Sequence, residues 1–239
     1  MRGIVVVKLG GRSVETAEGR AQLAARLAAL ARSGAALVVV HGGGAQVTAA
    51  LAASGIEARF VDGLRVTDGK VMEVAEPVFA HVGKTLADAL TRAGARAVAL
   101  TGRDAHLVRA TVKDPRLGRV GTVASVDAAL LRALHDAGLV PVVGPVAVDD
   151  AGPLNVNADE VASGVARALR ADELLLLTDV PAVRGADGKP IATLTPRAAE
   201  ALIASGAATG GMIPKIRGAL EALATGVARV RVLDEPGLT

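Results

Sequence analysis

The chain has 239 residues, a formal net charge of +3 and no cysteine. The lack of cysteine excludes a disulfide framework, a thiolate zinc site and a cysteine nucleophile. Two aromatic residues and scattered basic residues argue against nucleic-acid binding through stacked bases or a basic patch. Its apolar runs are too short to span a bilayer and its N-terminus has no signal-peptide pattern, so we expect a cytoplasmic protein without membrane contact.

Short apolar runs alternate with Ala- and Leu-rich stretches of helical periodicity. In chain order, the first part predicts a strand over 4–9, a helix over 17–31 with Thr16 as N-cap, a strand over 37–40, a helix over 44–53, a hairpin over 57–66, a helix over 69–92 and a strand over 95–100. The remainder predicts short strands within 101–124, a helix over 127–136, strands over 139–143 and up to 148, a helix over 158–169, a strand over 173–178, a turn-rich stretch over 180–195, helices over 196–204 and 214–224, and a strand over 227–233.

This alternation predicts an α/β fold. A mainly parallel, open central sheet would lie between two layers of helices, as a three-layer αβα sandwich. A polar turn at 149–154 is the candidate boundary between an N-terminal lobe, 1–150, and a C-terminal lobe, 151–239, which share one continuous sheet.

Three glycine clusters lie at strand ends or helix starts, where open α/β sheets bind ligands. They are Lys8-Leu9-Gly10-Gly11, His41-Gly42-Gly43-Gly44 and Thr209-Gly210-Gly211. Glycine lets the backbone approach an anion closely, and helix N-termini supply free N–H groups. A tight turn also explains any single cluster, but three together, two of them with a nearby lysine, favour phosphate chemistry.

Two lysines and one acid are candidates for that chemistry. Lys215 lies in the first turn of a predicted helix, where a cation opposes the helix dipole unless an anion binds; the alternative is a solvated side chain. Lys8 ends a buried strand, where a charge requires a partner. Asp159, at another helix start, is the candidate partner, although a first-turn acid also stabilises its own helix. The three suit phosphoryl transfer, which needs no general base when the acceptor is a carboxylate.

The other candidate motifs carry less weight. Arg65 ends the predicted hairpin and is placed to hold a substrate carboxylate bidentately, although a single arginine is more often a surface residue. Gly83-Lys84-Thr85 lacks the earlier glycine and the preceding strand of a P-loop. The glycines after His41 lack the spacing of a nicotinamide-dinucleotide fingerprint. The four histidines have no metal-ligand spacing, and His41 is interpreted as a structural hydrogen-bonding residue.

Six stretches, in order along nearly the whole chain, resemble the amino acid kinase family. They cover residues 7–11, 40–44, 60–68, 155–159, 177–181 and 210–215. Within the family, Gly-Leu-Arg-Val-Thr and Asn-Val-Asn-Ala-Asp are similar to the branch that phosphorylates N-acetyl-L-glutamate. The resemblance implies a carbamate kinase-like fold, ATP and Mg²⁺ as cofactors, and phosphorylation of the substrate's side-chain carboxylate. The product would be N-acetyl-L-glutamyl 5-phosphate, in the second step of arginine biosynthesis.

The resemblance also implies roles for individual residues. Lys8 and Lys215 would stabilise the transferring phosphoryl group, and Asp159 would hold both lysines in place. The N-terminal lobe would dimerise and bind the amino-acid substrate through Gly43, Gly44, Arg65, Asn155 and Asn157. The C-terminal lobe would bind ATP, and the implied ATP contacts are Gly10, Gly11, Thr178, Asp179, Val180, Val183, Thr209, Gly210 and Gly211. No side chain is expected to hold the metal, because Mg²⁺ would be bound through the ATP phosphates.

The chain departs from the family pattern in a few places. Ala45 stands where proline is usual, and Ala182 where glycine is usual. Most members of the family continue past the strand predicted over 227–233 through another helix and a final strand, so this chain is either naturally short or part of a longer polypeptide. No segment before the first predicted strand matches the N-terminal helix that links dimers of arginine-inhibited relatives into a hexamer. We therefore expect a homodimer that arginine does not inhibit, and the sequence identifies no regulatory partner.

The alternative function is phosphorylation of aminoadipate or glutamate attached to a small carrier protein. That branch keeps the lysines and glycines, alters the stretch around Arg65, and needs a basic surface for an acidic carrier. A non-catalytic nucleotide-binding subunit would have lost its lysines, whereas Lys8 and Lys215 are present. A nicotinamide-dependent reductase shares the layered architecture but needs the missing glycine fingerprint.

Overall fold

The computed structural model describes residues 3–10, 15–177, 220, 223, 224 and 226–233. The elements predicted over 180–195 and 196–204 lie outside the described residues, as does most of the helix predicted over 214–224.

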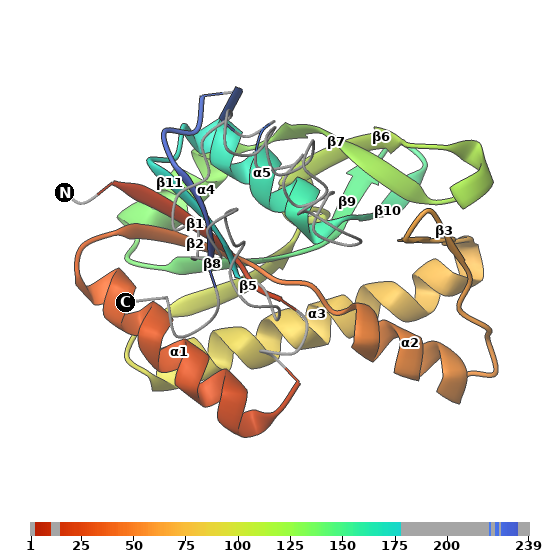
Figure 1. Ribbon diagram of the computed structural model, residues 1–239, viewed down its shortest axis with the longest axis horizontal. Helices are drawn as coiled ribbons and strands as arrows, with labels where there is room; N and C mark the ends of the chain where they lie inside the picture. Colours follow the sequence, from red (N-terminus) through yellow and green to blue (C-terminus); the bar gives the residue numbers. More distant parts are fainter. Residues whose placement is uncertain (1–2, 11–14, 178–219, 221–222, 225, 234–239) are drawn as a thin grey trace, which may run out of the picture.

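A six-stranded parallel sheet forms the centre of the molecule (Figure 1). The strand order is β12-β11-β1-β2-β8-β5, and every neighbouring pair is parallel. The strands are β1 (Ile4–Lys8), β2 (Ala36–Val40), β5 (Ala97–Thr101), β8 (Val140–Gly144), β11 (Glu173–Leu177) and β12 (Val230–Leu233). Most are continuous β-branched or leucine runs, as strands covered on both faces require. The predicted α/β class with a parallel central sheet is therefore confirmed.

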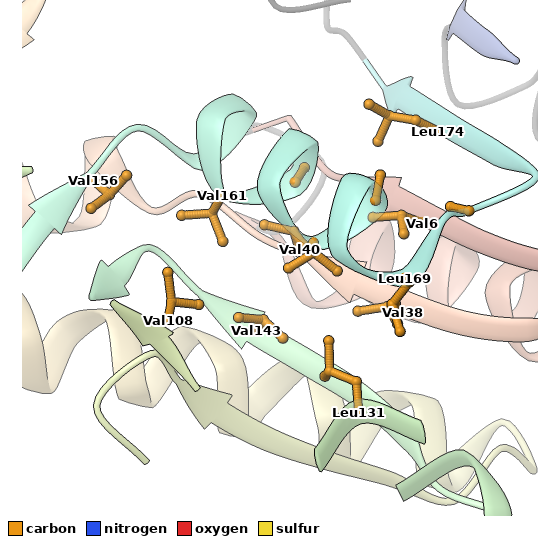
Figure 2. Packing of buried hydrophobic residues seen from close by; sticks show 14 of the residues in the cluster. Val6, Val38, Val40, Val108, Leu131, Val143, Val156, Val161, Leu169 and Leu174 are labelled. Carbon is orange, nitrogen blue, oxygen red and sulfur yellow. The ribbon is translucent and has the colours of Figure 1, made fainter. Parts of the chain in front are cut away.

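Helices cover both faces of this sheet. On one face, α1 (Ala17–Arg32) and α3 (Gly69–Arg92) pack Leu23, Leu27, Leu86 and Leu90 against the sheet. On the other face lie α4 (Ala128–Asp136) and α5 (Ala158–Leu169), whose leucines and valines surround Val6, Val38 and Val40 (Figure 2). The remaining helix, α2 (Gly44–Ala53), packs on the N-terminal part of α3 through Val47 and Leu51.

A small barrel and a hairpin extend from one end of the sheet (Figure 1). The barrel consists of β6 (Val108–Val112), β7 (Val120–Val126), β9 (Val146–Asp149) and β10 (Gly152–Val156). Two short 3-10 turns, η2 (Asp104–His106) and η3 (Pro115–Leu117), flank β6. The hairpin pairs β3 (Phe60–Val61) with β4 (Leu64–Arg65) around Asp62 and Gly63, as predicted.

Most predicted elements form within three residues of their expected bounds. Thr16 caps α1 as expected, and its hydroxyl accepts the Gly19 N–H. The stretch 149–154, predicted as a polar turn between lobes, contains a turn only at its start. From Gly152 it becomes β10, which pairs antiparallel with β9. The division into lobes at 150 stays a prediction.

In the part of the chain that the structure describes, no helix is long and apolar enough to cross a membrane.

Candidate functional site

The carboxyl ends of the parallel strands bring two of the predicted motifs together. Lys8 is the last residue of β1 and pairs in register with Val40, the last residue of β2. The Leu9 N–H donates to the Val40 carbonyl at 2.8 Å, so the two chains still lie side by side as they leave the sheet. The glycine run starts two residues later, at Gly42. The Lys8 backbone and the glycine run therefore share the sheet edge where α/β proteins bind ligands.

The expected ion pair between Lys8 and Asp159 forms. The Lys8 Nζ lies 3.0 Å from Asp159 Oδ1, and the two side chains are 9% and 20% exposed. Asp159 is in the first turn of α5, whose N-cap is Asn157: the Asn157 Oδ1 accepts the Asp159 N–H at 2.8 Å. Because α5 packs on β1 through the core, the helix start holds the carboxylate beside the lysine. The ion pair thereby holds a largely buried ammonium group in a fixed position at the sheet edge.

The glycine run forms the N-terminus of α2 without a side-chain cap. Gly43 is the N-cap residue and has a φ of 157°, and a Cβ there would lie 3.0 Å from the Phe79 ring. Only glycine fits this position, for reasons of both backbone conformation and space. The first-turn N–H groups of a helix have no partner within the helix, so this terminus can bind an anion.

Arg65 links the hairpin to this helix. It is buried, and its Nη2 donates to the Gly44 carbonyl at 2.9 Å and to the Thr48 hydroxyl at 2.8 Å. The guanidinium also lies 4.8 Å from the centre of the Phe60 ring, its cross-strand neighbour. Its Nη1 is buried without a hydrogen-bond partner among the described residues. Burial lowers the pKa of this guanidinium, which nevertheless stays charged.

The hydrogen bonds of Arg65 bear on its predicted role. The sequence predicts that Arg65 holds a substrate carboxylate bidentately, and in the structure Nη2 already has two protein acceptors. Nη1 is therefore the terminal nitrogen left for a ligand. The described contacts favour a carboxylate that binds mainly to this nitrogen, and not to Nη1 and Nη2 together.

Asn155 lies in β10 and Asn157 is the N-cap of α5, and their side chains have different partners. The Asn155 Nδ2 donates to the Thr67 hydroxyl at 3.0 Å, and that hydroxyl donates to the Arg65 carbonyl at 3.0 Å. Asn155 is therefore joined to Arg65 through Thr67. The Asn157 Oδ1 caps α5 instead.

His41 is fully buried next to the glycine run. Its Nδ1 lies 2.6 Å from the Gly42 carbonyl, and its ring packs against Gly83 and Gly144. Burial lowers the pKa of the imidazole to about 4, and the bond to Gly42 offsets only part of this effect. The ring is therefore neutral at pH 7, with Nδ1 as the donor, as the interpretation of His41 as a structural residue requires.

Several predicted site residues lie outside the described residues. They are Gly11, Thr178, Asp179, Val180, Val183, Thr209, Gly210, Gly211 and Lys215. Gly10, the second residue after the end of β1, is the one predicted ATP contact within the described part. Among the residues that the structure describes, no group of three or more His, Cys, Asp or Glu could hold a metal ion.

Sequence reasoning missed two residues of the site, Thr48 and Thr67. Thr48 lies one turn after Gly44 in α2, and its hydroxyl both donates to the Gly44 carbonyl and accepts from Arg65. Thr67 lies in the Gly-Leu-Arg-Val-Thr stretch used for the resemblance. Its place in that stretch indicated a residue of the site. Its role could not be predicted, because the partner of its hydroxyl, Asn155, is 88 residues away in the sequence.

Comparisons with known proteins find similarity over nearly the whole chain. A family model described as the amino acid kinase family matches residues 3–234. A protein of Paracoccus denitrificans named acetylglutamate kinase is 43% identical over 234 residues, which are 97% of this chain and 77% of the relative. The crystal structure of smu.665 from Streptococcus mutans is similar to this chain, with a TM-score of 0.86 at 30% identity. The match covers 98% of this chain and 96% of the chain in that structure.

A more distant structure supports the fold alone. Carbamate kinase from Giardia lamblia, bound to AMP-PNP, has a TM-score of 0.73 at 17% identity, over 98% of this chain and 92% of that one. The expected carbamate kinase-like fold is confirmed.

Proposed function

Because the chain belongs to the amino acid kinase family, we propose that it phosphorylates the side-chain carboxylate of N-acetyl-L-glutamate at the expense of ATP. The product is the acyl phosphate N-acetyl-L-glutamyl 5-phosphate. Relatives named acetylglutamate kinase, about 42% identical over nearly the whole chain, support this substrate and a role in arginine biosynthesis. ATP is the phosphoryl donor that the family implies.

The observation that carries the proposal is the buried ion pair between Lys8 and Asp159 at the edge of the sheet. Phosphoryl transfer places negative charge on the oxygens of the moving group, and a fixed cation stabilises that charge. Lys8 is held in place before any ligand arrives, because Asp159 and the end of β1 fix it from two sides. No general base is needed, since the acceptor carboxylate is already ionised at neutral pH.

The acceptor would bind between the hairpin and the start of α2. Arg65 Nη1 would hold one carboxylate of the substrate, with Asn155 beside it. The uncapped N-terminus of α2, at Gly43 and Gly44, would face the phosphoryl oxygens and the reacting carboxylate. Asn157, whose Oδ1 already accepts the Asp159 N–H, would offer a ligand its amide nitrogen and the second lone pair of that oxygen.

The remaining parts of the site stay predictions. Gly10 and the predicted ATP contacts outside the described residues would bind the nucleotide, and Lys215 would be the second cation at the phosphoryl group. Mg²⁺ would be held by the ATP phosphates. Mg²⁺ commonly binds through substrate phosphates, which is the basis of that assignment. The cytoplasmic location also stays a prediction.

We also propose that the protein is a homodimer. The parallel sheet ends at β5, which pairs only with β8 among the described strands. Ala97 to Leu100 on this strand are only partly buried. An open sheet edge with apolar residues is a surface that proteins cover or pair, and a second copy of the chain would cover it.

The reaction can be tested by trapping the acyl phosphate as its hydroxamate. With MgATP, we expect product from N-acetyl-L-glutamate but not from L-glutamate or N-acetyl-L-aspartate. Lys8→Ala should lower the rate by at least about 100-fold, because it removes the fixed cation. The matched control, Lys84→Ala, removes an exposed lysine of α3 and should retain wild-type activity.

Two results would contradict the proposal. Activity that persists in Lys8→Ala would remove Lys8 from the phosphoryl site. A protein that binds ATP tightly but phosphorylates no free acid would instead support the carrier-protein substrate.

A further inference from the structure

We propose that Thr67 is a positioning residue that orients the Asn155 amide and ties it to Arg65 at the substrate-carboxylate end of the site. This inference rests on the proposed function, in which Arg65 and Asn155 bind the acceptor. Thr67 has no exposed surface, so its hydroxyl acts through these two residues and not on the substrate directly.

The direction of the hydrogen bonds determines the orientation. A threonine hydroxyl has one hydrogen to donate, and Thr67 Oγ1 donates it to the Arg65 carbonyl at 3.0 Å. Towards Asn155 the same oxygen can therefore only accept, and it accepts from Nδ2 at 3.0 Å. An amide rotated by 180° would place two acceptors against each other. The Asn155 Oδ1 and the second Nδ2 hydrogen are thus left in defined positions for a ligand.

The backbone around Thr67 keeps the hydroxyl from moving. The Thr67 N–H donates to the Leu117 carbonyl at 2.9 Å, and the Thr67 carbonyl accepts from the Arg119 N–H at 2.6 Å. Between these two residues, Gly118 has a φ of 70°, and a Cβ there would lie 2.5 Å from the Thr67 carbonyl oxygen. The loop can approach this closely only because residue 118 is glycine.

The same loop also fixes Asn155. The Asn155 N–H donates to the Arg119 carbonyl at 2.9 Å, so one residue bonds to the backbones of both Thr67 and Asn155. The Arg119 side chain in turn bonds to Asp149 and to the carbonyls of Gly152 and Pro153, at the start of β10. Thr67 and Asn155 are therefore held at a constant separation, and the hydroxyl completes the link between their side chains.

The kinetic test compares two substitutions. Thr67→Val keeps the shape but removes the hydroxyl, and we expect it to raise the KM for N-acetyl-L-glutamate by about 10- to 100-fold, because it leaves polar groups unpaired. The KM for ATP should change less than about twofold. Thr67→Ser keeps the hydroxyl and should restore most of the affinity. Thr91→Val is the matched control, since the Thr91 hydroxyl also donates and accepts, but at the far end of α3.

A purely structural role would give a different pattern. Thr67→Val would then raise both KM values or lower only the melting temperature, and Ser would not restore selectivity. In an Asn155→Ala background, Thr67→Val should add almost nothing to the KM for the acceptor. An undiminished, multiplicative effect there would overturn the proposal.

A second readout does not depend on activity. The chain has only two asparagines, Asn155 and Asn157, so labelling asparagine with ¹⁵N gives two side-chain amide pairs in an NMR spectrum. Thr67→Val should shift the Asn155 pair and speed its hydrogen exchange, while the Asn157 pair and the Thr67→Ser spectrum stay close to wild type. An Asn155 pair unaffected by Thr67→Val would overturn the contact. A wild-type protein that shows this contact but does not phosphorylate N-acetyl-L-glutamate would overturn the proposed function and, with it, the substrate role of Thr67.

Discussion

Individual buried polar atoms determine the chemistry of this site. Lys8 has its counter-charge in Asp159. Arg65 has two acceptors on Nη2, while its buried Nη1 has none among the residues that the structure describes. The pairing of Lys8 could be predicted, because a cation at the end of a buried strand requires an anion and Asp159 begins a helix. The roles of Thr48 and Thr67 could not, since their hydroxyls join segments that meet only in the folded chain.

His41 leads to a prediction about pH. The unfolded chain has an ordinary histidine pKa of 6.5, whereas burial lowers the folded value to about 4. Between these values the unfolded state binds a proton that the folded state does not, so acidification favours unfolding. The stabilisation by the neutral ring is complete above pH 6.5 and is lost as the pH falls towards 4. Between pH 7.5 and 5 the loss is about 2 kcal/mol.

Denaturant unfolding at both pH values measures this loss. In His41→Asn, the change in the free energy of unfolding between these pH values should be smaller than in wild type by about that amount. The carboxylates contribute equally to wild type and variant, so their effect cancels in the comparison. His106→Asn replaces an exposed histidine and should keep the wild-type dependence. Equal dependence in wild type and His41→Asn would show that the ring does not resist protonation.

At the scale of elements, caps and periodicity made the helices predictable. The bounds of α2, α3 and α5 match the prediction, since Gly43, Asp68 and Asn157 precede them as suitable N-caps. The missed element is β10. Its sequence begins with Gly152 and Pro153, which are typical of turns, and it forms because it can pair with β9 and β7. Pairing across the barrel outweighs local propensity there.

The start of α2 gives a prediction at this scale. Gly43→Ala forces a side chain into a φ of 157° and against the Phe79 ring, so we expect a loss of about 1–3 kcal/mol in the free energy of unfolding and loss of activity. Gly69→Ala, at the start of α3, adds a methyl group where no atom lies within 4 Å, and should change stability by less than about 1 kcal/mol. Denaturant unfolding of both variants compares the two helix starts. If Gly43→Ala is as stable as Gly69→Ala, the backbone conformation at residue 43 does not require glycine.

For the whole molecule, the sheet predicts how copies associate. If the open edge at β5 pairs with a second chain, light scattering should give twice the 23.9 kDa chain mass at micromolar concentration. A charged substitution at Val98, a partly buried residue of β5 that belongs to none of the core clusters, should shift the mass towards one chain. A wild-type monomer or a hexamer would contradict the homodimer.

The place of β1 in the sheet has a consequence for synthesis of the chain. β1 is made before the other strands that the structure describes, yet it lies between β2 and β11, and Val5 pairs with Glu173. At typical synthesis rates, roughly 10–30 s pass before residues 173–177 exist. During that time one edge of an apolar strand in the nascent chain has no native partner. The strand that covers this edge, β11, is made only after β2, β5 and β8.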